Sequence, residues 1–371
     1  MISVFGSDIT NSEINAVTEV MKSQWSGFGK VVSDFESTYM QKYSLPNFAM
    51  VDSGSNALYM AVHLLDLPPE SEVIVPSFTW VSCAQAVLLC GHRPVFCDVD
   101  IDTMNVTSKD IQAAITPKTK AIMIVHYAGL SVDMQPIIDL GLPIIEDAAH
   151  AINSTYNGTP CGIIGDIGIF SYDAVKNLTT GEGGGITSRN HNLIERAKTL
   201  RYCGIGKSGF ESAAQQAQGS RSRWWEYNIQ EPFIKMLPIN IHAAIGLEQL
   251  KRIDSLQARR KEIWDFYQSS FHNHSNIQRP CEAKNGDSHS YFTYCIRVTR
   301  RDELASHLLD KKIYTTLRYH PLHMNALYQQ KDLHLPKCEQ LNETALSIPL
   351  HPRLSNEEVN YIIEAILEFY R

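Results

Sequence analysis

Between residues 47 and 190, short runs of apolar residues alternate with stretches of helical periodicity. The runs are continuously apolar rather than alternating in polarity, which is typical of strands buried on both faces. Strands separated by helix-length segments predict an α/β fold, a mostly parallel sheet wrapped by helices. The strands are predicted at residues 73–75, 94–96, 121–125, 143–145 and 167–170.

The pattern changes beyond residue 200. Residues 204–235 show no clean periodicity, and a loop of this length is uncommon unless it is functional. Helical and alternating segments then follow one another, which is typical of a small α+β unit. Helices are predicted at about 239–267, 301–312 and 356–370, and strands at 291–298 and 314–319.

Length and pattern together predict two domains. The chain has 371 residues, 44% of them hydrophobic, whereas a single domain usually takes about 100–200 residues. We expect a large α/β domain over residues 1–250, which includes the N-terminal segment and the 204–235 loop. A smaller α+β domain is expected over residues 251–371.

Composition excludes several classes of protein. The net charge of -7 argues against a general nucleic-acid binder, which would carry a basic face. The eight cysteines are scattered without a CxxC pair or a His/Cys spacing typical of metal ligands, so no metal site is expected. The N-terminus lacks the pattern of a signal peptide, and no apolar run reaches the length of about 18 residues that a membrane helix needs. We therefore expect a cytoplasmic protein with no membrane contact.

Four chemically distinctive side chains follow four of the predicted strands. They are, in chain order, Trp80, His126, Asp147 and Lys176. In parallel sheets, ligands bind beyond the carboxyl ends of the strands. We therefore expect the four side chains to share one site.

Asp147 and Lys176 are the pair that pyridoxal phosphate requires. A lysine supplies the amine for a Schiff base with the cofactor aldehyde, and a buried carboxylate keeps the pyridine nitrogen protonated so that the ring accepts electrons. Lys176 also precedes the glycine-rich turn 179–185, where the backbone can approach a ligand closely. Alone, Lys176 could be a solvated surface residue and Asp147 a helix cap. Their combination indicates a cofactor site.

Residues 51–61 add a candidate phosphate site. The stretch predicts a tight turn that opens a helix, and backbone N–H groups at a helix N-terminus bind anions. Ser171 can add a hydroxyl from a neighbouring strand, and Trp80 offers a flat face for a pyridine ring. His150, one helical turn after Asp147, is either a structural residue or a contact of the cofactor's ring oxygen.

Eight segments spread over most of the chain carry a family resemblance. They are Ser53–Leu58, Pro76–Trp80, Pro94–Asp100, Val125–Gly129, Glu146–Ala151, Lys176–Gly184, Ala243–Leu250 and Pro321–His323. With them the chain resembles the sugar aminotransferases of the DegT/DnrJ/EryC1/StrS family, within the fold type I pyridoxal-phosphate enzymes. The resemblance implies an aspartate-aminotransferase-like fold and pyridoxal 5'-phosphate as the cofactor.

The resemblance also implies roles for individual residues. Lys176 would be the Schiff-base lysine and Asp147 the partner of the pyridinium nitrogen. The other cofactor-binding residues would be His150 near the ring hydroxyl, Trp80 on the ring face, and Gly54, Ser55, Asn56 and Ser171 in the phosphate segments.

The identity of residue 176 bears on the reaction. The dehydratase branch of the family has histidine at this position, so Lys176 favours transamination. The resemblance implies L-glutamate as the amino donor and a nucleotide-linked keto deoxysugar as the acceptor, in a pathway such as lipopolysaccharide O-antigen biosynthesis. The Val125–Gly129 run is similar to that of members acting at the sugar C4, which favours C4 over C3. The nucleotide and the sugar configuration stay open.

Candidates for substrate contacts are cations and aromatic residues outside the cofactor segments. Such side chains hold a diphosphate or stack on a base, although each could be a plain solvated residue. They are Lys207, Arg221, Arg223, Trp224 and Trp225 in the loop, and Arg318, His320 and His323 near the end of the chain.

One segment departs from the family pattern. Family members usually have an Asn close to a basic residue that reaches the cofactor phosphate of the neighbouring subunit. Here Lys235 keeps the basic character, but Leu237 stands where the Asn is expected, and Asn228 or Asn240 are the possible substitutes. We expect a homodimer with active sites at the subunit interface.

Two other functions have some support in the sequence. A dinucleotide-dependent oxidoreductase is suggested by the glycines of 181–185, but these do not lie between a first strand and its helix as a dinucleotide fingerprint requires. A regulatory or sensor protein that keeps the fold without turnover would be natural if Lys176 or Asp147 had been lost, and both are present.

Overall fold

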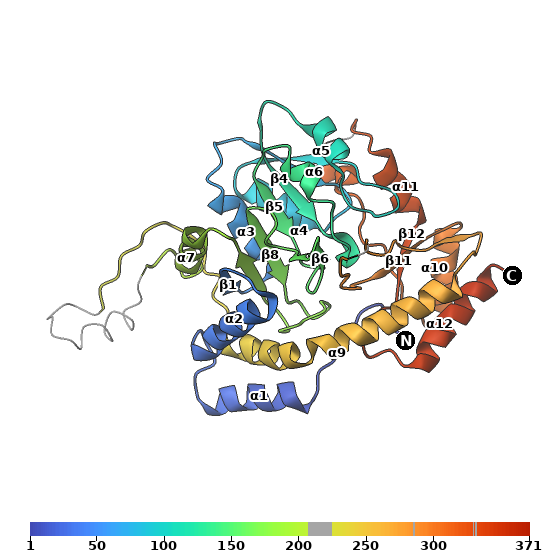
Figure 1. Ribbon diagram of the computed structural model, residues 1–371, viewed down its shortest axis with the longest axis horizontal. Helices are drawn as coiled ribbons and strands as arrows, with labels where there is room; N and C mark the ends of the chain where they lie inside the picture. The colour runs from blue at the N-terminus through green and yellow to red at the C-terminus, as the bar shows by residue number, and fades with distance from the viewer. Residues whose placement is uncertain (207–224, 285, 329, 331) are drawn as a thin grey trace.

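A seven-stranded sheet wrapped by helices forms the centre of the molecule (Figure 1). The computed structural model describes residues 1–371 except 207–224, 285, 329 and 331. The strands of this sheet are β1 (Phe48–Val51), β2 (Glu72–Pro76), β3 (Arg93–Cys97), β4 (Thr119–Val125), β5 (Ile144–Asp147), β8 (Ile167–Ser171) and β9 (Gly184–Thr187). Their order is β1–β9–β8–β5–β4–β2–β3.

The sheet is mostly parallel, as predicted. β8, β5, β4, β2 and β3 are parallel neighbours, and β9 is antiparallel to both β8 and β1. The five strands predicted from continuous apolar runs are all present, and every residue of β2, β5 and β8 is buried. β9 escaped prediction because it begins with two glycines. A Cβ on Gly185 would lie 2.3 Å from the ring of Phe48, so the approach of β9 to β1 requires glycine there.

Helices connect and cover the strands. α3 begins where the hydroxyl of Ser53 accepts a hydrogen bond from the Asn56 N–H, and α1 begins with a capping box between Thr10 and Glu13. The helices of this part of the chain are α1 (Asn11–Lys22), α2 (Lys30–Tyr43), α3 (Gly54–Leu64), α4 (Val81–Leu89), α5 (Ser108–Ala114), α6 (Gln135–Ile138), α7 (His191–Leu200) and the short η1 (Tyr127–Gly129).

The long helix α9 (Asn240–Ser270) joins the two parts of the molecule and matches the helix predicted at 239–267. Its first half packs against α1 and α2, and its far end lies beside the C-terminal helix α12 (Asn356–Phe369) (Figure 1). Leu250 belongs to the core around the central sheet, whereas Trp264 and Tyr267 belong to a second apolar core. The predicted domain boundary at residue 250 stays a prediction, and α9 crosses that position without interruption.

A three-stranded antiparallel sheet organises the C-terminal part. Its strands, in spatial order, are β10 (Ile277–Gln278), β11 (Tyr294–Val298) and β12 (Ala345–Ile348). The other elements are α10 (Arg301–Asp310), α11 (Pro336–Thr344), the short η2 (Leu322–Met324) and η3 (Ala326–Tyr328), and the earlier hairpin β6 (Thr155–Tyr156) and β7 (Thr159–Pro160).

The strand predicted at 314–319 is wrong. Only Thr316 pairs there, through an isolated bridge to Ser347, because the residues that follow turn away from the small sheet and line a cavity beside the central one. Among the described residues, no helix combines the length and apolar character needed to cross a membrane.

Candidate active site

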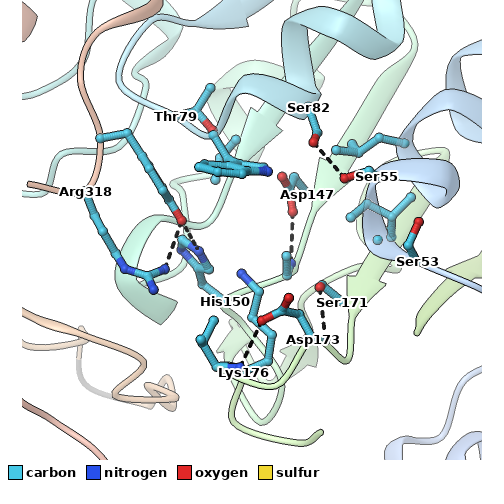
Figure 2. Close-up of a pocket in the computed structure, with 18 of the residues that line it drawn as sticks. Ser53, Ser55, Thr79, Ser82, Asp147, His150, Ser171, Asp173, Lys176 and Arg318 are labelled. Carbon is cyan, nitrogen blue, oxygen red and sulfur yellow. Dashed lines mark hydrogen bonds between the residues drawn. The ribbon is translucent and has the colours of Figure 1, made fainter. Parts of the chain in front are cut away.

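A cavity of about 530 Å³ lies at the carboxyl ends of β4, β5 and β8. Figure 2 shows four serines on one side of it and Arg318 on the other, with Asp147 and Lys176 between them. The predicted site residues that line this cavity are Gly54, Ser55, Trp80, Asp147, His150, Ser171, Lys176 and Arg318.

Asp147 is a buried carboxylate held by two donors. It ends β5 and is 5% exposed. Its Oδ1 accepts the Ala149 N–H at 2.9 Å, and its Oδ2 accepts the Cys83 thiol at 3.2 Å. No lysine or arginine of the described residues forms an ion pair with it. A buried carboxylate without a cationic partner is suited to a protonated ring nitrogen.

Lys176 lies on a turn after β8. Its N–H donates to the Asp173 carbonyl at 2.9 Å, and the Asp173 carboxylate accepts the Val175 N–H at 2.9 Å, so the turn is closed by local bonds. The Nζ atom lies 4.8 Å from the centre of the Phe292 ring. Burial, together with the charge of Arg318, lowers the pKa of Lys176 to about 8. A substantial fraction of the amine is therefore neutral near physiological pH.

Hydroxyl groups converge on the N-terminus of α3. The hydroxyls of Ser55 and Ser82 are 2.7 Å apart, and buried Ser171 packs against Gly54. A Cβ on Gly54 would lie 2.7 Å from the Cβ of Ser171, so only glycine lets the helix start so close to β8. Backbone N–H groups and hydroxyls around a helix N-terminus form an anion site. Ser82 was missed from the sequence because nothing in its segment separates it from other helix residues.

Aromatic and imidazole rings close the cavity opposite the serines. Trp80 is half exposed, and its ring centre lies 5.5 Å from that of Tyr319. The ring of His150 stacks on Phe292 with centres 4.0 Å apart. Burial lowers the pKa of His150 well below its usual range, and the charges of Lys176 and Arg318 act in the same direction. His150 is therefore neutral near physiological pH.

Arg318, Tyr319 and His150 form a hydrogen-bonded chain, drawn in Figure 2. Nη1 of Arg318 donates to the Tyr319 hydroxyl at 3.0 Å, and that oxygen lies 3.0 Å from Nε2 of His150. Because a guanidinium only donates, the hydroxyl oxygen accepts from Arg318 and the hydroxyl hydrogen is available to Nε2. Nδ1 of His150 is buried and has no partner among the described residues. A polar group of a bound ligand would satisfy it.

The arrangement fits pyridoxal phosphate on four independent counts. One cavity is surrounded by four groups of the described residues. They are the anion site at Gly54, which a Cβ would fill, the Lys176 amine with its lowered pKa, the Asp147 carboxylate without a cationic partner, and the unpartnered Nδ1 of His150. A sequence profile of the DegT/DnrJ/EryC1/StrS aminotransferase family matches residues 7–367. The chain belongs to this family.

Individual relatives cover nearly the whole chain. The dTDP-4-dehydro-2,3,6-trideoxy-D-glucose 4-aminotransferase of Saccharopolyspora spinosa is 35% identical over 373 residues, which cover 98% of this chain and 95% of the relative. The GDP-perosamine synthase of Escherichia coli O157:H7 is 35% identical over 378 residues, covering 100% and 98%.

The fold agrees with solved structures of similar proteins. Spr1654 of Streptococcus pneumoniae in its PMP form is 30% identical, with a TM-score of 0.91 over 99% of this chain and 98% of that one. Its PLP form gives a TM-score of 0.88 over 98% and 97%. The family member described here is therefore a pyridoxal-phosphate-dependent nucleotide-sugar aminotransferase with the fold predicted from its sequence.

Three histidines do not line the cavity, contrary to expectation. His126 is fully buried, with Nε2 2.9 Å from Glu146 and Nδ1 accepting the Val132 N–H. His323 is buried against the Ser77 hydroxyl at 2.6 Å, and exposed His320 contacts Asn342. Within the described residues they make packing and surface bonds, and a role of His320 or His323 in substrate binding stays a prediction.

Other candidates also lie elsewhere. Asn56 directs its amide to the Asp52 carboxylate at 2.8 Å instead of into the cavity. Trp225 is exposed and does not line the cavity. The remaining loop candidates, Lys207, Arg221, Arg223 and Trp224, lie outside the described residues.

The segment that departs from the family pattern is only partly explained. Asn240 uses both ends of its amide within the chain: Oδ1 accepts the Val32 N–H and Nδ2 donates to the Trp25 carbonyl. It is therefore not free to replace the family's Asn. Lys235 and Asn228 are exposed and Leu237 is partly exposed, so the cross-subunit contact stays a prediction.

Replacing Gly54 with alanine should weaken cofactor binding about tenfold, since the added methyl collides with Ser171 and overpacking of this kind costs about 1–3 kcal/mol. The measurement is an absorbance titration of the apoprotein with pyridoxal phosphate. Gly27→Ala is the matched control, because a Cβ there meets nothing within 4 Å. Equal dissociation constants of pyridoxal phosphate for the two variants would contradict a phosphate site at the N-terminus of α3.

The rate at which the apoprotein captures the cofactor aldehyde should depend on the protonation of Lys176. Only the neutral amine attacks, so the rate constant rises with pH by about tenfold per unit and levels off near pH 8. Stopped-flow absorbance between about pH 6 and pH 10 measures it. A rate that keeps rising toward the usual lysine pKa of about 10.4 would refute the effect of burial.

Proposed function

We propose that this enzyme transfers the amino group of L-glutamate to the C4 keto group of a nucleotide-linked deoxysugar. The observation that carries the proposal is the presence, in one cavity, of an amine with a lowered pKa, an unpaired carboxylate and a buried arginine. The activity named for the Saccharopolyspora spinosa relative, a 4-aminotransferase, supports C4. The same chain is equally similar to a GDP-perosamine synthase, so the nucleotide stays open.

Arg318 supports an acidic amino donor. Its side chain is 7% exposed, lines the cavity and forms no ion pair with a carboxylate of the described residues. A buried guanidinium without a counter-charge is costly, and a carboxylate of the bound donor would supply one. We propose that Arg318 binds the carboxylate of L-glutamate. This role takes precedence over the contact with the sugar nucleotide that the sequence suggested for Arg318.

The chain's own residues divide the work between them. When bound, pyridoxal phosphate supplies an aldehyde that takes up the amino group and a ring that accepts electrons. Asp147 would keep the ring nitrogen protonated, and the serines around α3 would hold the phosphate. The neutral Nζ of Lys176 would act as the base that takes the proton from the amino-bearing carbon of the donor. The sequence of proton transfers runs in reverse with the keto sugar.

Lys176→Ala should retain the aminated cofactor but lose turnover by about a thousandfold, because both half-reactions use the same base. The assay supplies glutamate with a panel of 4-keto and 3-keto sugars on UDP, dTDP, GDP and CDP, and measures 2-oxoglutarate release. Lys30→Ala, at an exposed position on α2 where the amine pairs with Asp34, is the control. Normal turnover by Lys176→Ala would rule the assignment out.

The same panel separates the alternatives. Amination of 3-keto sugars alone would move the reaction to C3. Binding of the cofactor without release of 2-oxoglutarate from any sugar would favour a non-catalytic sensor that keeps the fold.

We infer that the enzyme works in the cytoplasm as a homodimer with its active sites at the subunit interface. Large apolar side chains that a monomer would expose support the dimer, among them Trp25 after α1 and Ile229 and Ile234 before α9. Analytical ultracentrifugation should give a molecular mass of twice the 41.8 kDa of the chain. A single monomeric boundary at micromolar concentration would contradict the dimer.

A further inference from the structure

We propose that Phe5 is a positioning residue for Arg318. Its ring holds the guanidinium in the orientation that receives the carboxylate of the amino donor, an inference that rests on the proposed function. Phe5 is 313 positions from Arg318 in the sequence, yet both line the same cavity.

The guanidinium of Arg318 is held mainly by aromatic rings. Its Cζ lies 3.7 Å from the centre of the Phe5 ring and 4.8 Å from that of Phe292. Its only side-chain hydrogen bond within the described residues is the one from Nη1 to Tyr319, and buried Nε has no partner. Contact with a ring face fixes the plane of a guanidinium while leaving its N–H groups unpaired. Those groups are the ones a carboxylate needs.

The N-terminal segment is anchored on both sides of Phe5. Ile2 exchanges backbone hydrogen bonds with the segment after α10, to the Lys312 carbonyl at 2.7 Å and from the Tyr314 N–H at 2.9 Å. Val4 is buried, and the Asp8 carboxylate pairs with Arg252 of α9 at 2.7 Å. Phe5 is therefore held by its neighbours in the chain against the C-terminal part of the molecule. Its contact with Arg318 belongs to the packed lining of the cavity.

Close packing beside Phe5 points the same way. A Cβ on Gly6 would lie 2.9 Å from Nδ1 of buried His351, so the segment cannot shift toward the small sheet. The backbone around Phe5 is thus confined from both sides, and the ring has little freedom to leave the guanidinium.

The experiment compares Phe5→Leu with Phe5→Tyr in the purified holoenzyme. Leucine keeps the apolar bulk but removes the ring face, whereas tyrosine keeps the face. Binding of glutarate, a dicarboxylate with no amino group to transfer, is measured by calorimetry, and KM is measured separately for glutamate and for the sugar nucleotide. Phe369→Leu is the matched control, because Phe369 holds Arg300 at 4.6 Å on a distant surface.

Phe5→Leu should weaken glutarate binding and raise the KM of glutamate by roughly three- to thirtyfold. The KM of the sugar nucleotide and the visible absorbance of the bound cofactor should stay unchanged, and Phe5→Tyr should restore glutarate binding.

Two results would overturn the role of Phe5 and leave the proposed function intact. One is unchanged glutarate binding in Phe5→Leu. The other is an equal rise in the KM of both substrates, which would indicate a general structural effect. A wild-type enzyme that ignores glutarate and glutamate but aminates the sugar from another donor would overturn the proposed donor, and the inference with it.

Discussion

Two consecutive carboxylates at the end of β5 organise the site. Successive side chains of a strand point to opposite sides, so Asp147 faces the cavity while Glu146 faces the interior. Glu146 is fully buried and accepts hydrogen bonds from the backbone N–H groups of Gly162, Ile164 and Gly165, and from His126. These bonds fix the chain that leads into β8. The distance between the acid and the lysine of the site therefore depends on a carboxylate that never contacts the ligand.

The electrostatics of the cavity follow from burial around Phe292. Lys176, Arg318 and His150 all pack on this one ring. Three cations at that spacing would repel one another with little solvent to screen them. Burial resolves the conflict by lowering the pKa values of the lysine and the histidine. Arg318 then remains as the permanent cation beside a histidine that is neutral and a lysine whose amine is more easily deprotonated than usual.

The sequence predicts the site residues that lie near the ends of the predicted strands. Lys176, Asp147 and Trp80 follow apolar runs within a few residues, and the rule that ligands bind at the carboxyl ends of parallel strands brings them together. The same rule failed for His126, because a strand end does not reveal to which side the next residue turns. The role proposed for Phe5 could not be predicted from the sequence for another reason. Phe5 has no chemical signature of its own and acquires a role only when residue 318 folds against it.

Holding an active-site arginine with a ring solves a problem that a carboxylate would create. A protein carboxylate would satisfy the guanidinium in the resting enzyme and compete with the incoming donor, so that each turnover would first have to break a buried ion pair. A ring face stabilises the charge without occupying any N–H group. Under the proposed function, the enzyme must also release a keto acid and admit a sugar into the same cavity, and a partner that does not compete would let Arg318 engage and disengage a carboxylate in every cycle. The separation of Phe5 and Arg318 in the chain is then a consequence of the fold, since the N-terminal segment, anchored beside residues 312–314, reaches the cavity that Arg318 lines.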